Sequence, residues 1–327
     1  MIVFCATDAG PAKYLIPIIQ QVNYPYRVYG SSVSISIFED AGIEALGYDE
    51  FCEELEINLA VLGTTLGNTL EKQILELSKL DDFQVISIIE HWTNFKERFF
   101  KDGQYLFPDH IFVNDAWAKE QAILEGLPSK NIKVVGNPVL EAQQQLYKGS
   151  KNRNIPKKFL FISERLDTDM PKEGSRYLGY NQYDVLDDIV GCLSQEKILH
   201  LKLHPTESVR NYSDYLTNQN VEVISADAMR LHLFDYEAIV GMESMLLLEM
   251  AAQGIPVYSY RPNSNRSFVG CEMRWVSEID KAALKLLIRT GEGKSIDTTA
   301  VPSFSGSLDY ILKIIRNFYE NSCLNSG

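Results

Sequence analysis

Short apolar runs alternate with segments of helical periodicity along most of the sequence. The strand-like runs are IVFCAT (2–7), LAVLGTT (59–65), QVISIIE (84–90), HIFVND (110–115), IKVVGNP (132–138), KFLFIS (158–163), ILHLKLH (198–204), VEVISA (221–226), EAIVGM (237–242) and IPVYSY (255–260). In the segments between them, apolar residues recur at three- and four-residue steps, as on one face of a helix. Strands separated by helices pair in parallel, so the alternation predicts an α/β fold with parallel sheets covered by helices.

The pattern restarts near the middle of the chain. A chain of 327 residues is too long for one ordinary core and fits two domains. A polar, basic segment at 148–158 (KGSKNRNIPKK) precedes the strand-like run KFLFIS. We therefore predict two Rossmann-like domains, 1–147 and 148–327. The amphipathic segment SLDYILKIIRNFYEN (307–321) predicts a last helix that packs back on the first domain.

The charge balance limits the partners. The formal net charge of −13 argues against a nucleic-acid partner and against strong attraction to anionic lipid. The basic run at 148–158 leaves at most a small basic patch, and a solvated linker explains it as well.

The cysteines and the apolar runs indicate the compartment. The five cysteines are scattered without a CxxC or metal-like spacing, which predicts reduced thiols. The start, MIVFCAT, lacks a basic region and is typical of a first strand rather than a signal peptide. No apolar stretch approaches the roughly 18 residues of a membrane span. We expect a cytoplasmic protein, at most peripheral to the inner membrane.

The stretch GMESMLLLEMAAQGIPVYSY (241–260) predicts a phosphate site. A strand ends at Gly241, Glu243 or Ser244 can cap the helix that follows, and the backbone near Met245 offers free N–H groups. Glu249, in the first two turns, could reach two ribose hydroxyls. The alternative is a capped helix with one solvated glutamate.

A second signal is His204, followed by Pro205. Proline cannot donate to a sheet ladder, so the strand ends here and leaves an imidazole at its carboxyl end. Ligands of open parallel sheets bind outside the carboxyl ends of the strands. A histidine placed there can donate a charge-assisted hydrogen bond or a proton to a leaving phosphate, or it can be structural.

These stretches together resemble the GT-B glycosyltransferases and the related UDP-N-acetylglucosamine 2-epimerases. A helix carrying a glutamate, then G-x-P and a strand, is how both groups bind nucleotide. KVVGNPVLE (133–141) looks like the passage that ends the first domain in the MurG-like branch, and ATDAGPAKYLIPII (6–19) looks like the opening strand, loop and helix. Gly10 in that loop allows close approach of a ligand. The resemblance implies the GT-B fold, two Rossmann-like domains with parallel sheets facing a central cleft.

The His-Pro pair is similar to that of bacterial sialyltransferases, Kdo (3-deoxyoctulosonate) transferases and CDP-polyol transferases. In the sialyltransferases this imidazole contacts the donor phosphate. FISERLDTD (161–169) resembles the loop after the first strand of the second domain. The resemblance gives Ser163 and Glu164 a place facing the cleft and makes Arg165 a phosphate partner; a plain charged loop is the alternative. The epimerases carry a His-Arg-Arg-Glu-Asn run here and this chain does not.

The first half offers candidates for the base. An inverting transferase needs a carboxylate or imidazole to deprotonate the acceptor. Asp8 follows the first strand, where it could equally cap a helix. Glu90 and His91 follow the strand-like run QVISII at the same rim. Residues of the loop GTTLGN can contact sugar or phosphate, or form a mere turn: Thr64, Thr65 and Asn68.

The predicted function is glycosyl transfer from a nucleotide sugar, with a CMP-linked acidic sugar such as a sialic acid-like nonulosonate or Kdo favoured. The acceptor would be a glycan or another hydroxyl in bacterial surface polysaccharide synthesis. The alternatives are a UDP-GlcNAc 2-epimerase or hydrolase and an inactive sugar-nucleotide-binding module. We expect no cofactor and no metal, since GT-B enzymes usually act without one. The choice between Asp8 and Glu90, inversion or retention, and the oligomeric state stay open.

Overall fold

A computed structural model describes residues 1–51, 56–81, 83–147, 158–174, 176–264, 266–295, 297 and 299–325. The chain divides into two units, Met1–Gln143 with Ser303–Gly327, and Gln144–Pro302. Of the basic run at 148–158, only Lys158 lies within the described residues. In the described part, no helix is long and apolar enough to cross a membrane.

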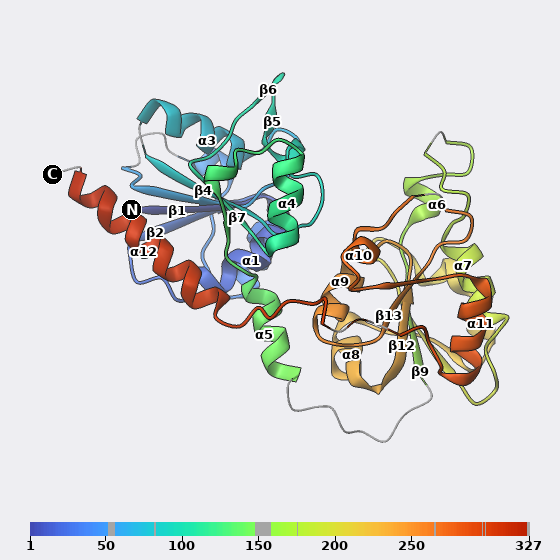
Figure 1. Ribbon diagram of the computed structural model, residues 1–327. Coiled ribbons are helices and arrows are strands. Elements are labelled where there is room, and N and C mark those ends of the chain that lie inside the picture. Colours follow the sequence, from blue (N-terminus) through green and yellow to red (C-terminus); the bar gives the residue numbers. More distant parts are fainter. Residues whose placement is uncertain are drawn as a thin grey trace. The chain divides into compact units, whose positions relative to one another are not determined.

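Unit 1 contains a six-stranded parallel sheet with the order β2-β1-β3-β4-β7-β8 (Figure 1). Its strands are β1 (Ile2–Ala6), β2 (Tyr26–Gly30), β3 (Leu59–Leu62), β4 (Gln84–Ile89), β7 (His110–Val113) and β8 (Ile132–Val134). A small antiparallel hairpin joins β5 (Phe100–Lys101) to β6 (Gln104–Tyr105). The helices are α1 (Ala9–Ile19), α2 (Ser32–Asp40), α3 (Leu70–Asp81), α4 (Ala116–Leu124) and α12 (Ser307–Asn325), with short 3₁₀ turns at Tyr48–Glu50, Glu97–Phe99 and Ser129–Asn131. Helix α5 (Pro138–Tyr147) contains the boundary between the units, after Gln143.

Unit 2 repeats this plan with the order β11-β10-β9-β12-β13-β14, again all parallel. Its strands are β9 (Lys158–Ile162), β10 (Ile198–Lys202), β11 (Val221–Val223), β12 (Tyr236–Gly241), β13 (Val257–Tyr260) and β14 (Ser277–Ile279). The helices are α6 (Leu166–Asp169), α7 (Gln182–Val190), α8 (Ala226–Leu231), α9 (Met245–Ala252), α10 (Val269–Glu272) and α11 (Lys281–Thr290), with 3₁₀ turns at Val209–Tyr212, Tyr215–Thr217 and Leu233–Asp235. The predicted fold class, α/β with two Rossmann-like parts, is confirmed.

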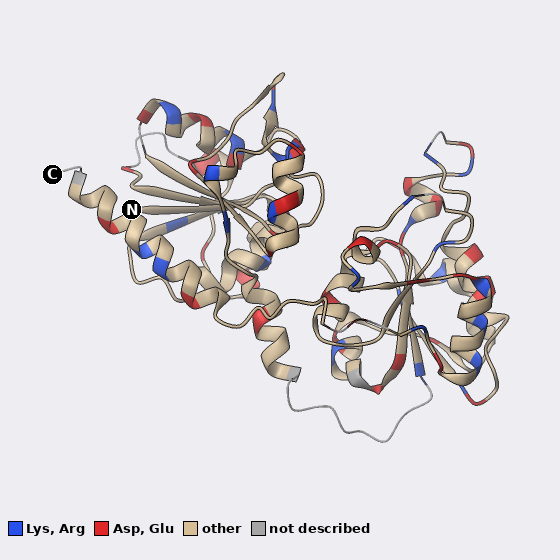
Figure 2. Ribbon diagram, in the orientation of Figure 1, with Lys and Arg blue, Asp and Glu red and all other residues tan. Residues whose placement is uncertain are grey.

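Four strands were not predicted from the sequence: the short hairpin strands β5 and β6, and the edge strands β2 and β14. An edge strand has only one neighbour and is partly solvated, so it needs no continuous apolar run. β2 begins with the exposed Tyr26 and Arg27, and the middle residue of β14, Glu278, is exposed. Figure 2 shows the same contrast, because charged residues lie mainly on helices and loops and few lie on the strands.

The last helix, α12, belongs to unit 1. Its apolar face joins the core that α1 and α2 form on one face of the sheet, through the buried Ile311 and Ile315. The Glu141 carboxylate accepts hydrogen bonds from the backbone N–H groups of Gly306 (2.5 Å) and Leu308 (2.9 Å). A carboxylate at these N–H groups fixes where the helix starts, which opposes fraying of α12 from the core.

Candidate active-site residues

The strand ends of unit 1 bring the predicted base candidates to one edge. Strands β1, β3 and β4 are neighbours, so the loops after them are adjacent. Asp8 stands at the N-cap position of α1, but its side chain makes no capping hydrogen bond. The residue is exposed, and burial of part of the carboxyl raises its pKa, as does the nearby Glu71, while Arg98 opposes the shift. The carboxylate is therefore accessible to a substrate rather than used as a cap.

Glu90 lies at the end of β4 and is almost enclosed. Burial raises its pKa to about 7, and in the described part of the chain its Oε2 atom has no hydrogen-bond partner. Its Oε1 atom lies 3.3 Å from Nε2 of His91. Burial lowers the pKa of His91 to about 4, so this imidazole is neutral near pH 7. A side chain at Gly10 would place Cβ 2.9 Å from Glu90 Oε1, so glycine leaves room for this carboxyl group.

Two further charged residues, Glu71 and Arg98, organise this edge. The buried Glu71 carboxylate accepts hydrogen bonds from the backbone N–H of Thr7 (2.8 Å) and the hydroxyls of Thr7 and Thr65. The buried Arg98 guanidinium donates to the carbonyl of Thr64 at 2.7 Å. Arg98 is therefore buried beneath these loops and does not lie at the surface.

Of the three residues after β3 that were predicted to contact sugar, the two threonines make hydrogen bonds within the protein. Thr64 and Thr65 are buried, and their hydroxyls donate to the Ile88 carbonyl (2.9 Å) and to Glu71 (3.1 Å). Asn68 is exposed, and its amide donates to Asp102 at 3.1 Å. The threonines shape the loop, whereas Asn68 is the member of the set that lies at the surface.

In unit 2, Glu207 holds the turn that carries His204. Its carboxylate accepts from the backbone N–H of His204 (2.7 Å), the Ser163 hydroxyl (3.1 Å) and the Tyr212 hydroxyl (2.5 Å). Sequence reasoning missed this role, although Glu207 stands three residues after the histidine, which is the spacing of a side chain that reaches back to a backbone N–H. Ser163 is thus part of a buried network and does not face solvent.

The imidazole of His204 is itself exposed. Its Nδ1 atom lies 2.9 Å from the Thr206 hydroxyl and 3.3 Å from the Thr206 backbone nitrogen, which donates to it. An Nδ1 atom that accepts this bond assigns the ring proton to Nε2. In the described part of the chain, Nε2 makes no hydrogen bond. Pro205 follows directly, but β10 already ends at Lys202, so the strand is shorter than the predicted run to His204.

The start of α9 is occupied by a side chain of the protein. Glu164, after β9, accepts a hydrogen bond from the backbone N–H of Glu243 at 2.7 Å. Burial raises the pKa of Glu164 to about 7, although backbone N–H groups at this helix start favour its charged form. Ser244 is the N-cap and accepts from the backbone N–H of Leu246 at 3.2 Å. The Glu243 carboxylate, considered as a cap, instead pairs with Arg261 (3.3 Å) and Arg266 (2.5 Å).

The other residues predicted in unit 2 lie at the surface of the same region. Glu249 is half-buried on α9, and Met245 is the first residue of that helix. Arg165 does not stand alone, because its guanidinium binds Asp169 at 2.7 Å in an exposed ion pair. In the described residues, no group of three or more His, Cys, Asp or Glu side chains could hold a metal ion.

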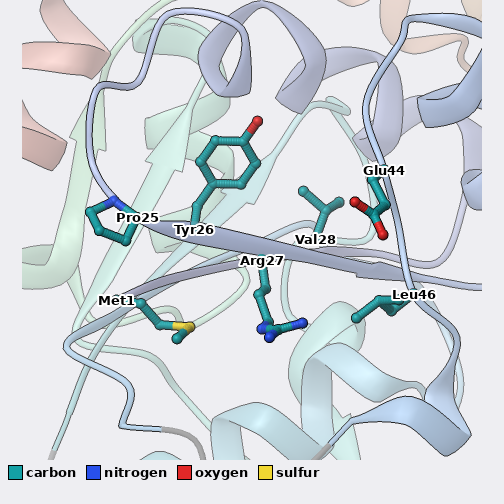
Figure 3. A pocket seen from close by; sticks show the side chains of 7 residues that line it. All are labelled: Met1, Pro25, Tyr26, Arg27, Val28, Glu44 and Leu46. Atoms are coloured by element: carbon teal, nitrogen blue, oxygen red, sulfur yellow. The ribbon is translucent and has the colours of Figure 1, made fainter.

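One hollow lies away from these residues. It has a volume of about 420 Å³ and lies at the amino ends of β1 and β2, where Figure 3 shows Tyr26 and Arg27 extending from β2. Parallel sheets bind their ligands at the opposite edge, so we do not assign a substrate to it.

Comparisons with known proteins identify the fold. No protein-family model matches the sequence, and no curated protein matches it in sequence. The UDP-GlcNAc 2-epimerase from Methanocaldococcus jannaschii has a similar structure, with a TM-score of 0.66, 16% identity, and coverage of 97% of this chain and 99% of that one. The lipopolysaccharide outer core galactosyltransferase WaaB gives a TM-score of 0.54 at 15% identity over 100% and 99% of the two chains. HepE of Anabaena, solved with UDP and glucose, gives 0.52 at 12% identity over 99% and 98%.

At these identities the likeness shows the fold alone. It confirms the predicted fold of two Rossmann-like domains, and the resemblance to the GT-B superfamily is a likeness of fold. The narrower resemblance to sialyltransferases and Kdo transferases stays a prediction.

Proposed function

We propose that the protein is a glycosyltransferase that moves a sugar from a nucleotide-activated donor to a hydroxyl acceptor. The observation that carries the proposal is the exposed His204 imidazole, held from behind by Thr206 so that Nε2–H points away from the turn. A proton donor in this position suits a phosphate that gains charge as it leaves.

Asp8 supplies the base. A base must touch the acceptor hydroxyl, and Asp8 is exposed while Glu90 is nearly enclosed. The acceptor oxygen bonds to the anomeric carbon as its proton passes to Asp8. The bond between the anomeric carbon and the phosphate oxygen breaks, and the phosphate keeps that electron pair while His204 donates to it. Direct displacement of this kind inverts the anomeric centre.

The donor is best sought among CMP-linked acidic sugars, because the His-Pro pair resembles the sialyltransferase motif. Two structures of similar fold were instead solved with uridine nucleotides, an epimerase with UDP-GlcNAc and UDP and HepE with UDP, so UDP sugars are the competing class. The deciding experiment measures the melting temperature with CMP, UDP, GDP and ADP, and then turnover of the matching sugar with and without a glycan. Transfer only in the presence of the glycan supports the proposal.

Glu249 gives a second test of the nucleotide site. If its carboxylate binds the ribose hydroxyls, Glu249→Gln weakens binding of the stabilising nucleotide by about 1.5–3 kcal/mol. The matched control is Glu292→Gln, an exposed glutamate of the same unit. Equal affinity in both variants would remove Glu249 from the site.

The second candidate is a UDP-GlcNAc 2-epimerase or hydrolase, favoured by the similarity to epimerase structures at a TM-score of 0.66. UDP-GlcNAc incubated without an acceptor separates the two. Release of a free sugar or formation of the 2-epimer would establish this candidate. It is excluded if UDP-GlcNAc stays unchanged without an acceptor and is consumed only after a glycan is added.

A further inference from the structure

The hairpin of unit 1 carries an exposed group of aromatic side chains. Phe100 on β5 and Tyr105 on β6 are 39% and 37% exposed, and their rings lie 5.2 Å apart. Phe107 stacks on Tyr105 with ring centres 6.2 Å apart. Figure 1 shows the hairpin projecting beyond the sheet of this unit. Large aromatic side chains at a projecting tip leave apolar faces available to a ligand.

A hollow of about 690 Å³ lies against the Phe100 side of this hairpin. Apart from Gly67 and Gly103, its lining residues come from the loop after β3, the loop after β4 and the hairpin: Leu66, Asn68, Asn94, Glu97, Phe100 and Asp102. These loops leave the same carboxyl edge of the sheet as Asp8 and Glu90. The hollow combines an aromatic face with amide and carboxylate groups, which is a mixture suited to the apolar faces and hydroxyls of a sugar.

Hydrogen bonds connect the loop after β3 to the hairpin, and these two segments form walls of the hollow. The buried Lys72 ammonium donates to the carbonyls of Gly67 (2.5 Å) and Phe100 (2.8 Å), joining the loop to the hairpin. Above it, Asn68 donates to Asp102 at 3.1 Å. Asp102 has a φ of 47° and the next residue, Gly103, a φ of 87°, as a tight two-residue hairpin turn requires. The hollow is therefore preformed, which lowers the entropic cost of binding.

The charge of the hollow is negative. Its ionisable lining residues are Glu97 and Asp102, and both are exposed. The ammonium groups nearby are already engaged: Lys72 with the two carbonyls, Lys101 with Glu76, and Lys96 over the Tyr105 ring at 4.4 Å. A ligand with carboxylates or phosphates would meet like charge, whereas a neutral or amino-bearing ligand would not.

We propose that this hollow binds the acceptor of the reaction, and that the acceptor is a saccharide chain without negative charge, with a preference for one that carries a free amine. Its role as the acceptor site rests on the glycosyl transfer proposed above; the binding itself does not. A sugar ring stacks on Phe100, the Asn68 and Asn94 amides meet hydroxyls, and the Glu97 and Asp102 carboxylates attract an ammonium group.

The test measures binding of three tetrasaccharides by calorimetry, without donor: glucosamine (cationic), N-acetylglucosamine (neutral) and galacturonate (anionic). We expect measurable binding of the first two, tighter for glucosamine, and none of the third. Phe100→Ala should weaken binding of both at least tenfold. Tyr26→Ala, an exposed aromatic at the other edge of the same unit, should leave it unchanged.

Two charge variants test the specificity. Asp102→Asn keeps a residue that favours the positive φ of the turn, and Glu97→Gln keeps the size of its side chain. Each should weaken binding of the glucosamine tetramer more than binding of the neutral one, and so reduce the preference between them.

The inference fails if the galacturonate tetramer binds best, if no tetrasaccharide binds, or if Phe100→Ala binds like the unaltered protein. A nucleotide that still raises the melting temperature while no saccharide binds overturns this inference alone. Saccharide binding without any nucleotide effect overturns the transferase proposal instead.

Discussion

The Glu164 carboxylate binds the backbone N–H of Glu243 at a distance of 2.7 Å, where a donor phosphate is expected at the start of α9. These residues are far apart in the sequence and meet because β9 and β12 are neighbours in the sheet. An ionised Glu164 would compete with a phosphate for this N–H group and repel it. A protonated Glu164 would do so much less.

Nucleotide affinity should therefore depend on pH through Glu164. Its pKa is raised to about 7, so the carboxyl gains charge as the pH rises above that value. Where binding needs the neutral form, the dissociation constant rises by about tenfold per pH unit above the pKa. Calorimetry at pH 6, 7 and 8.5 measures it for the unaltered protein and for Glu164→Gln. Protonation of the nucleotide itself changes the dissociation constant equally in the two proteins. The additional rise of the dissociation constant with pH that is due to Glu164 should be absent in Glu164→Gln. Parallel curves would mean that phosphate does not bind at this helix start.

Turnover should depend on His204 much more than stability does. His204→Ala should lower turnover by roughly 10²–10⁴, as for loss of a general acid. The melting temperature should change little, because the ring is exposed and leaves no cavity. The matched control is His232→Ala, which removes an exposed histidine of unit 2 that binds Asp235. Turnover of the folded His204 variant with saturating donor is the measurement, and near-normal turnover would make His204 structural.

Glu90→Gln should change how stability depends on pH. The folded-state pKa of Glu90, about 7, lies above its usual 4.5, so the folded state holds a proton that the unfolded chain releases. The stabilisation of the folded state by this proton is fully present below pH 4.5 and is lost as the pH rises to about 7. Glutamine never ionises, so the variant should gain stability relative to the unaltered protein across this window, by about 3 kcal/mol at most. Urea unfolding at pH 5 and pH 8 measures the difference in unfolding free energy between the variant and the unaltered protein. The pH dependence that His91 contributes has the opposite sign, and it cancels in this difference because both proteins contain His91. A constant difference would contradict a buried, proton-holding Glu90.

Gly136→Ala should destabilise the protein by disrupting the contact between Gly136 and the start of α12. Gly136 has a φ of 84°, and an added Cβ would lie 1.9 Å from Ser307 Oγ. Strain and the clash together should cost more than about 2 kcal/mol of unfolding free energy. Gly42→Ala is the matched control, since φ is 74° there and no atom lies within 4 Å of the added Cβ. A larger loss at Gly136 than at Gly42, measured by urea unfolding, isolates the contact with α12.

The alternating pattern by itself determined the class of fold and the strands that end at the candidate site. Apolar runs report burial, and burial on both faces is what central parallel strands require. The turn after β10 was readable for a local reason, since Pro205 cannot donate to a sheet ladder and the chain turns between His204 and Glu207. Asp115 stands directly before α4 and caps it by accepting a hydrogen bond from the backbone N–H of Ala118 at 2.7 Å, a local role of aspartate at a helix start.

Only the tertiary structure decided which charged residues meet. Glu71 reaches Thr7, Glu164 reaches Glu243, and Glu207 reaches Ser163 across neighbouring strands. Periodicity distinguishes buried from exposed faces within one segment, but it carries no information about which segments become neighbours. The order of strands in the sheet decides that, and with it the pKa of Glu164, the burial of Arg98 and the accessibility of Asp8. The chemistry of this site is therefore a product of non-local contacts between side chains whose local sequences look like ordinary charged loops.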